Sequence, residues 1–160
     1  MTSSKSRAVV LHLVRQGESN LVVQVIDSLY GRRSLLLRGV GKGRLAGAAA
    51  ALHPMSVIEL VAYDSPYGSL RCIREFEPLF ALNGIRGNIC KSTVAIFMAE
   101  VLYRGIREGD GGPELFNWLV ESVVRLDAAG GSAANFHLWW MAGFCGMMGF
   151  AISPQGLSDA

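Results

Sequence analysis

The residues of this chain best suited to chemistry are cationic and lie close together in the sequence. Residues 31–44 carry five basic side chains and no carboxylate: Arg32, Arg33, Arg38, Lys42 and Arg44. A turn, an apolar run and a glycine-rich loop hold these side chains. Guanidinium and ammonium groups pair with phosphate, and the phosphate backbone of a nucleic acid is the partner that this arrangement favours.

The distribution of charge supports this interpretation, although the formal net charge of the chain is only +2. Residues 1–51 hold eight cations and two anions, a net charge of +6, whereas the remaining seven cations face eleven acids, a net charge of −4. The positive field is therefore concentrated at one end. The alternative is a set of solvated strand edges, where Lys and Arg discourage pairing between sheets. The candidate nucleic-acid-binding residues are Arg7, Arg15, Arg32, Arg33, Arg38, Lys42 and Arg44.

No arrangement typical of an enzyme or a metal site accompanies these cations. The three histidines are far apart and lack Cys, Asp or Glu at metal-ligand spacing. Three scattered cysteines, without a C-x-x-C pair, are typical of a reducing cytoplasm. The segment 39–44 lacks the spacing of a phosphate-binding P-loop. We therefore predict no catalytic residue, no metal, no cofactor and a cytoplasmic location.

A long uncharged stretch, residues 128–158, raises the question of a membrane. Its apolar part, residues 138–152, is shorter than the ~20 residues that a membrane-spanning helix needs. The sequence therefore predicts a buried final helix and no membrane partner.

The first half of the chain must position the cations, and it is typical of β-structure. We expect five strands, at residues 7–15, 20–27, 33–40, 55–63 and 70–77, with a loop and a possible short helix in residues 41–53. Five short strands with a longer connection after the third are what a small OB-type barrel requires. Tyr30, Tyr63 and Tyr67 fall at strand ends and turns, where they could stack on unpaired bases or cap the barrel core.

The second half is typical of helices, which we expect at residues 85–108, 113–127 and 133–148, the last with Ser132 as N-cap. Helical spacing predicts a core shared by Phe97, Val101, Phe116, Leu119, Phe136 and Trp140. The fold class is therefore α+β, an OB-fold barrel at residues 1–80 followed by an all-α domain at residues 81–160.

Several segments, in order, resemble the bacterial RecO family of DNA repair and recombination mediators. They are Arg7-Ala8-Val9-Val10-Leu11, Gly17-Glu18-Ser19-Asn20-Leu21, Gly31-Arg32, Arg38-Gly39-Val40, Leu52-His53-Pro54-Met55-Ser56-Val57-Ile58-Glu59-Leu60, Ala99-Glu100-Val101-Leu102, Glu114-Leu115-Phe116 and Gly149-Phe150. The resemblance implies a non-enzymatic, nucleoid-associated protein that binds single- and double-stranded DNA and anneals complementary strands. It also implies cooperation with RecR in loading recombinase on SSB-coated DNA, and docking of the acidic C-terminal tail of SSB on the helical domain.

Two departures from the family pattern follow. Relatives usually continue further, many with a cysteine-rich zinc module, so we expect a fragment or a shortened form. The loop after Val40 has fewer cations than is common in the family, which predicts weaker DNA affinity.

For the SSB tail, Arg104 and Arg107 are the candidate cations beside a groove. Two other functions stay open: a protein-interaction adaptor that uses the helical domain, and an RNA-binding OB-fold protein.

Overall fold

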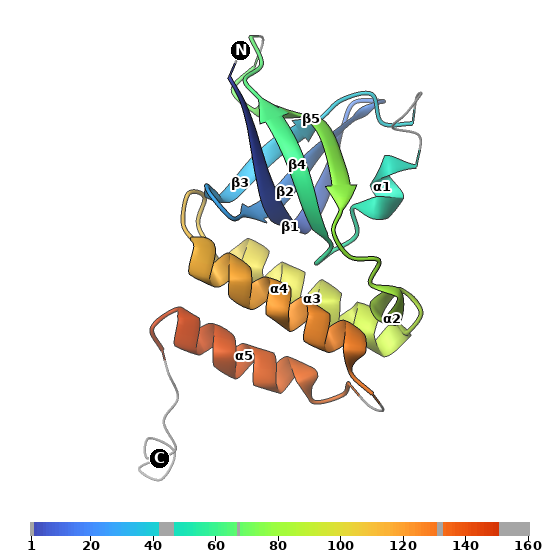
Figure 1. Ribbon diagram of the computed structural model, residues 1–160, viewed down its shortest axis with the longest axis vertical. Helices are drawn as coiled ribbons and strands as arrows, with labels where there is room; N and C mark the ends of the chain where they lie inside the picture. The colour runs from blue at the N-terminus through green and yellow to red at the C-terminus, as the bar shows by residue number, and fades with distance from the viewer. Residues whose placement is uncertain (1, 42–46, 67, 131–132, 151–160) are drawn as a thin grey trace.

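A β-barrel stands on a layer of helices in the computed structural model, which describes residues 2–41, 47–66, 68–130 and 133–150 (Figure 1). The barrel strands are β1 (Ser3–Gln16), β2 (Asn20–Asp27), β3 (Gly31–Leu37), β4 (Val57–Tyr63) and β5 (Arg71–Pro78). Helix α1 (Ala48–Ala51) lies in the connection between β3 and β4. The helical layer consists of α2 (Asn83–Arg86), α3 (Ile89–Gly105), α4 (Pro113–Ala128) and α5 (Phe136–Met147).

The barrel closes in the order β1-β2-β3-β5-β4, with β4 returning to pair with β1. Its neighbouring strands are antiparallel, except for a short parallel contact between β3 and β5 at Leu35 and Leu36. This small closed barrel, with a helix between the third and fourth strands, is the OB-fold arrangement that the strand pattern predicts. Among the described residues, no helix is long and apolar enough to cross a membrane.

Two separate cores follow from the alternation of side chains along the strands. Val10, Val23 and Leu35 belong to the core inside the barrel. An irregularity in the pairing between Val10 and His12 changes the alternation of β1. Val9 and Leu11, which alternate with Val10 along β1, join Ile26 and residues of the helices in a second core. The outer wall of the barrel therefore forms part of the helical core, which fixes how the two halves sit against each other.

The helices differ from their predicted bounds; α3, for example, ends at Gly105 and not at residue 108. The single helix predicted at residues 85–108 is two helices, because the chain breaks at Gly87 and Asn88. The Asn88 side chain then caps α3 by accepting a hydrogen bond from the Lys91 backbone N–H at 3.1 Å. Helix α5 begins at Phe136 after Asn135, so the prediction of Ser132 as its N-cap is wrong. Ser132 itself lies outside the described residues.

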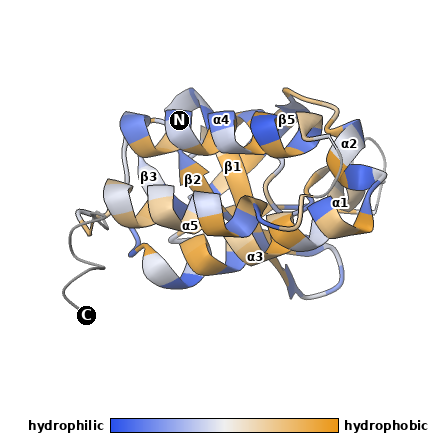
Figure 2. Ribbon diagram, turned by 90° about the horizontal axis from the view of Figure 1, so that it is seen from below, coloured by the Kyte–Doolittle hydropathy of each residue, from blue (hydrophilic) through white to orange (hydrophobic). Residues whose placement is uncertain are grey.

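Helix α5 lies beneath α3 and α4 and contacts both (Figure 1 and Figure 2). Phe116, Leu119 and Trp140 are fully buried between these helices, as predicted. Val101 and Phe136 are partly buried against the same core. The prediction for Phe97 is wrong: its side chain is 39% exposed and meets the Trp140 ring edge-on, with 6.5 Å between ring centroids.

Candidate nucleic-acid interface

Strand β3 carries two of the predicted cations, Arg32 and Arg33, and its alternation separates them. Leu35 and Leu37 point into the barrel, so Arg33 lies on the same side at the barrel mouth. Arg32, Ser34 and Leu36 take the opposite, outer side of the strand. Arg38 follows the last residue of β3 and is exposed. Cations that are neighbours in sequence therefore lie in three different environments.

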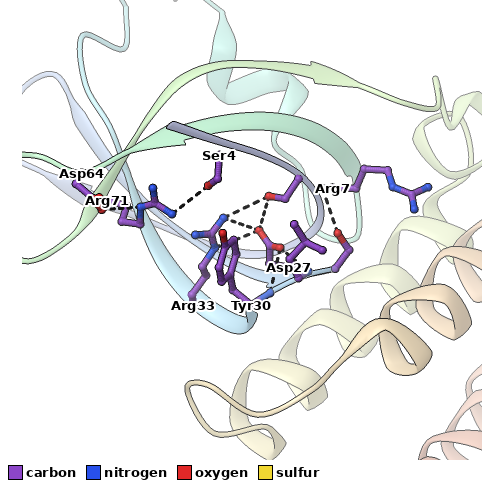
Figure 3. Close-up of polar contacts among 10 residues, drawn as sticks. Ser4, Arg7, Asp27, Tyr30, Arg33, Asp64 and Arg71 are labelled. Carbon is purple, nitrogen blue, oxygen red and sulfur yellow. Dashed lines mark hydrogen bonds and ion pairs between the residues drawn. The ribbon is translucent and has the colours of Figure 1, made fainter. Parts of the chain in front are cut away.

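At the barrel mouth, Arg33 is held by a buried carboxylate (Figure 3). Its Nη2 and Nε atoms lie 2.6 and 3.1 Å from Oδ2 of Asp27, whose side chain is completely buried. Ser6 donates to the same oxygen at 2.7 Å, and the backbone N–H of Leu29 donates to Oδ1 at 2.8 Å. Both carboxylate oxygens thus have donors, which is what makes a buried charge tolerable.

A half-exposed tyrosine extends this mouth network. The Arg33 guanidinium lies 4.4 Å from the centroid of the Tyr30 ring, and that of Arg71 lies 6.0 Å from it. Arg71 in turn lies 2.8 Å from Asp64 and donates to Ser4 at 3.0 Å. Tyr30 therefore caps the barrel mouth against two arginines. Tyr63 carries Arg74 over its ring at 5.5 Å, and Tyr67 lies outside the described residues.

Two further arginines pack on aromatic rings of the helical layer. Arg7 lies 5.4 Å from the centroid of Phe116, and Arg32 lies 4.9 Å from that of Tyr103. The backbone of Arg32 also binds the α3–α4 loop: its N–H donates to the Asp110 carbonyl, and its own carbonyl accepts from the Gly109 N–H, both at 2.8 Å. We call this two-bond contact the clasp. It makes Arg32 part of the joint between barrel and helices.

Gly31 allows the clasp to form. Its φ of +68° lies in the left-handed region that side chains disfavour. A Cβ atom there would lie 2.5 Å from the Asp110 carbonyl oxygen, far inside contact distance. Only glycine fits this close approach between the β2–β3 turn and the α3–α4 loop.

The remaining described candidates are Arg15, near the end of β1, and Arg38, just after β3. This end of β1 and β3 points away from the helical layer (Figure 1). Arg15 pairs with Leu21, which pairs with Leu37, the residue before Arg38. Both arginine side chains are exposed, and Arg38 donates to Ser65 at 3.2 Å. Glu18, in the β1–β2 turn at this end, offsets part of their charge. We call the surface around Arg15 and Arg38 the distal basic end.

Lys42 and Arg44 follow Arg38 in the chain but lie outside the described residues. The backbone before them is anchored, because the Val40 N–H donates to the Ser19 carbonyl at 2.8 Å. Val40, the second residue before Lys42 in the sequence, therefore lies beside the β1–β2 turn. Val40 is therefore part of the distal basic end.

Polar side chains on the outer wall of the barrel were missed by the sequence reasoning. Ser34 donates to the side-chain oxygen Oε1 of Gln24 at 2.9 Å, and His12 is the register partner of Gln24 on the next strand. The His12 ring lies against Tyr103, with 5.0 Å between centroids. These three polar side chains lie side by side across β3, β2 and β1. In the sequence they alternate with the apolar residues that face the barrel interior. This alternation is the signal that predicts them on the outer face.

Arg104 and Arg107, the candidates for the SSB tail, lie at the end of α3 and just after it. Both are exposed. Arg104 forms an ion pair with Glu100 one turn earlier, and the hydrogen bond between them raises the pKa of Arg104. No ion pair with Glu108 is found in the described part of the chain. Ile106, the residue before Arg107, lines a surface hollow. The same hollow is lined by two residues with carboxylates, Asp110 and Glu114.

In a comparison with known proteins, both halves of the chain match models of the same protein family. Residues 1–81 match the family described as "Recombination protein O N terminal", and residues 86–155 match "Recombination protein O C terminal". The chain is 33% identical over 134 residues to the DNA repair protein RecO of Bacteroides fragilis, covering 84% of this chain and 55% of that protein. For the DNA repair protein RecO of Phocaeicola vulgatus the identity is 31% over 146 residues, covering 91% and 60%.

The chain thus spans little more than half the length of these curated relatives. The two matched segments adjoin where the barrel ends and the helices begin. The barrel, the helical layer and the identities over most of its length agree: the chain belongs to the RecO family.

Proposed function

We propose that this chain is the DNA-binding part of a non-enzymatic recombination mediator that works in DNA repair in the cytoplasm, at the nucleoid. It binds single- and double-stranded DNA and anneals complementary strands. The observation that carries the proposal is the distal basic end: Arg15 and Arg38 are exposed there on an OB-fold barrel of the RecO family. Lys42 and Arg44 follow directly in the sequence.

The chemistry of this surface favours binding without sequence preference. Arginines that contact phosphate neutralise its charge and release counterions, but they do not distinguish bases. Annealing follows from the same contacts, since a protein that screens repulsion between two strands and leaves the base edges free favours pairing. The row formed by His12, Gln24 and Ser34 supplies hydrogen-bonding groups along the wall that leads to this surface.

The proposed protein partners are RecR and the acidic tail of SSB, whose carboxylates Arg104 and Arg107 would attract. Arg107 is exposed, whereas Arg104 must exchange Glu100 for the tail. Exposed ion pairs of this kind contribute little to stability, so the exchange is inexpensive. Calorimetry with the SSB tail peptide tests this assignment: undiminished affinity in an Arg104→Ala/Arg107→Ala double variant would place the peptide elsewhere.

Fluorescence anisotropy with labelled single- and double-stranded oligonucleotides of mixed sequence tests the proposed DNA binding. We expect binding at low salt. The logarithm of the association constant should fall linearly with the logarithm of the salt concentration. Unlabelled RNA should compete less well than DNA. Absence of binding at low salt would identify a protein-interaction adaptor, and stronger competition by RNA would identify an RNA-binding protein; either result contradicts the proposal.

A further inference from the structure

A second surface, on the helical layer, has the opposite charge and an apolar floor. The α3–α4 loop, the start of α4 and the end of α5 enclose a groove with a cavity volume of about 450 Å³. It is lined by Ile106, Asp110, Pro113, Glu114, Met147 and Met148, among others. We call this hollow the methionine groove.

The floor of the methionine groove is apolar and open to solvent. Met147 and Met148 are 38% and 42% exposed, at the end of a helix that carries no charged side chain. Ile106 and Leu115 are buried beside them. Methionine is flexible and polarisable, so a surface of this kind can adapt to an apolar side chain of a partner.

The rim of the groove is acidic. Asp110 and Glu114 are both exposed, and neither carboxylate forms an ion pair within the described part of the chain. Glu114 is in the first turn of α4, so it also offsets the positive end of that helix dipole. An acidic peptide or a phosphate backbone is repelled here, whereas a cationic partner is attracted.

We propose that the methionine groove binds a short cationic, amphipathic segment of a partner protein. One apolar side chain of the segment enters between Met147 and Met148, and flanking Lys or Arg side chains meet Asp110 and Glu114. This recognition combines an apolar anchor with a charged rim, as in other interactions between peptides and grooves. The surface is chemically distinct from the distal basic end, and it lies on the other half of the molecule.

Methyl NMR of the full chain labelled at its methionines tests the proposal. The probe is a short synthetic peptide with Leu at helical spacing and Lys between, compared with a peptide carrying Glu in place of each Lys. We expect the Lys peptide to shift the methyl signals of Met147 and Met148, assigned through Met147→Leu and Met148→Leu. Met55 and Met98, which are fully buried, serve as internal controls and should not move.

Charge variants complete the test. Asp110→Asn with Glu114→Gln should weaken the Lys peptide about five- to tenfold at low salt, with less difference at high salt. Glu121→Gln, an exposed carboxylate elsewhere on α4, should leave the affinity unchanged. Equal binding of the Glu peptide, unchanged Met147 and Met148 signals, or full affinity in the double variant would overturn the proposal. So would signals that change with protein concentration alone, since they would assign the groove to a second copy.

Discussion

The two ends of strand β3 carry the same type of side chain in opposite circumstances. At its start, Arg33 is paired with the buried Asp27, and Arg32 lies over Tyr103 and forms the clasp. Beyond its end, Arg38 is exposed with one hydroxyl contact. A cation with a buried carboxylate partner stabilises the fold, whereas an exposed one can bind a ligand. Arginine content alone therefore overestimates a nucleic-acid surface.

The same difference distinguishes the two halves of the molecule. The barrel presents two exposed arginines, Arg15 and Arg38, at the end far from the helices, and the helical layer presents acidic residues around the methionine groove. Between these surfaces, the arginines of the joint are packed on aromatic rings. If this account is right, variants at the joint or the mouth reduce stability, and variants at the distal basic end reduce DNA binding.

The largest effect on stability is expected at the barrel mouth. Arg33→Ala leaves the Asp27 carboxylate buried without its cation, which typically costs about 3–5 kcal/mol. Arg38→Ala is the matched control and should cost no more than about 0.5 kcal/mol, as for other exposed positions. Urea denaturation of both variants measures the difference. Equal losses of unfolding free energy would contradict the distinction between the two ends of β3.

A somewhat smaller loss is expected at the clasp. Gly31→Ala places a methyl group against the Asp110 carbonyl and requires a left-handed backbone conformation, which alone costs roughly 1–2 kcal/mol. We expect a loss of at least about 2 kcal/mol, measured by thermal or urea unfolding. Gly17→Ala is a useful control, because its φ is also positive (+71°) but a Cβ there meets nothing within 4 Å. Equal effects at both glycines would show that backbone strain, and not the clasp, matters.

The stacking of Arg32 on Tyr103 should contribute less. A double-mutant cycle with Arg32→Ala and Tyr103→Leu should give a coupling free energy of about 0.5–2 kcal/mol. The matched cycle between Arg38 and Tyr103 should give no coupling. Additive effects of Arg32→Ala and Tyr103→Leu would show that the contact between the guanidinium and the ring does not stabilise the joint.

The smallest effect concerns pH. Burial lowers the pKa of His53, in the loop before β4, below its ordinary value of 6.5. The unfolded chain therefore binds the proton more readily than the folded one. The contribution of His53 to the free energy of unfolding is fully present above about pH 6.5 and is lost as the pH falls from there through the lowered pKa. Replacing His53 by Asn should flatten the dependence of unfolding free energy on pH over this window. An unchanged slope would assign the dependence to other groups.

The sequence predicts the strands well because their signals are local. The second strand is predicted at its observed bounds, 20–27, whereas the third, predicted at 33–40, is observed at Gly31–Leu37. The roles of the arginines depend on closure of the barrel and on docking of the helices. Tyr103 lies 71 residues after Arg32 in the sequence, so no local pattern predicts their contact. Phe97 shows the same limitation. Helical spacing places it on the apolar face of α3 but does not predict which part of that face α5 buries.

The most direct test of the account compares the salt dependence of DNA binding between two double variants. Arg15→Gln with Arg38→Gln removes two charges from the distal basic end; Arg107→Gln with Arg125→Gln removes two from the helical layer. With a mixed-sequence single strand, the first pair should reduce the steepness of log affinity against log salt by about 1.4, two contacts at about 0.7 each. The second pair should leave the steepness unchanged. An unchanged slope in a folded Arg15/Arg38 variant, or an equal loss in both variants, would contradict the assignment of DNA binding to the distal basic end.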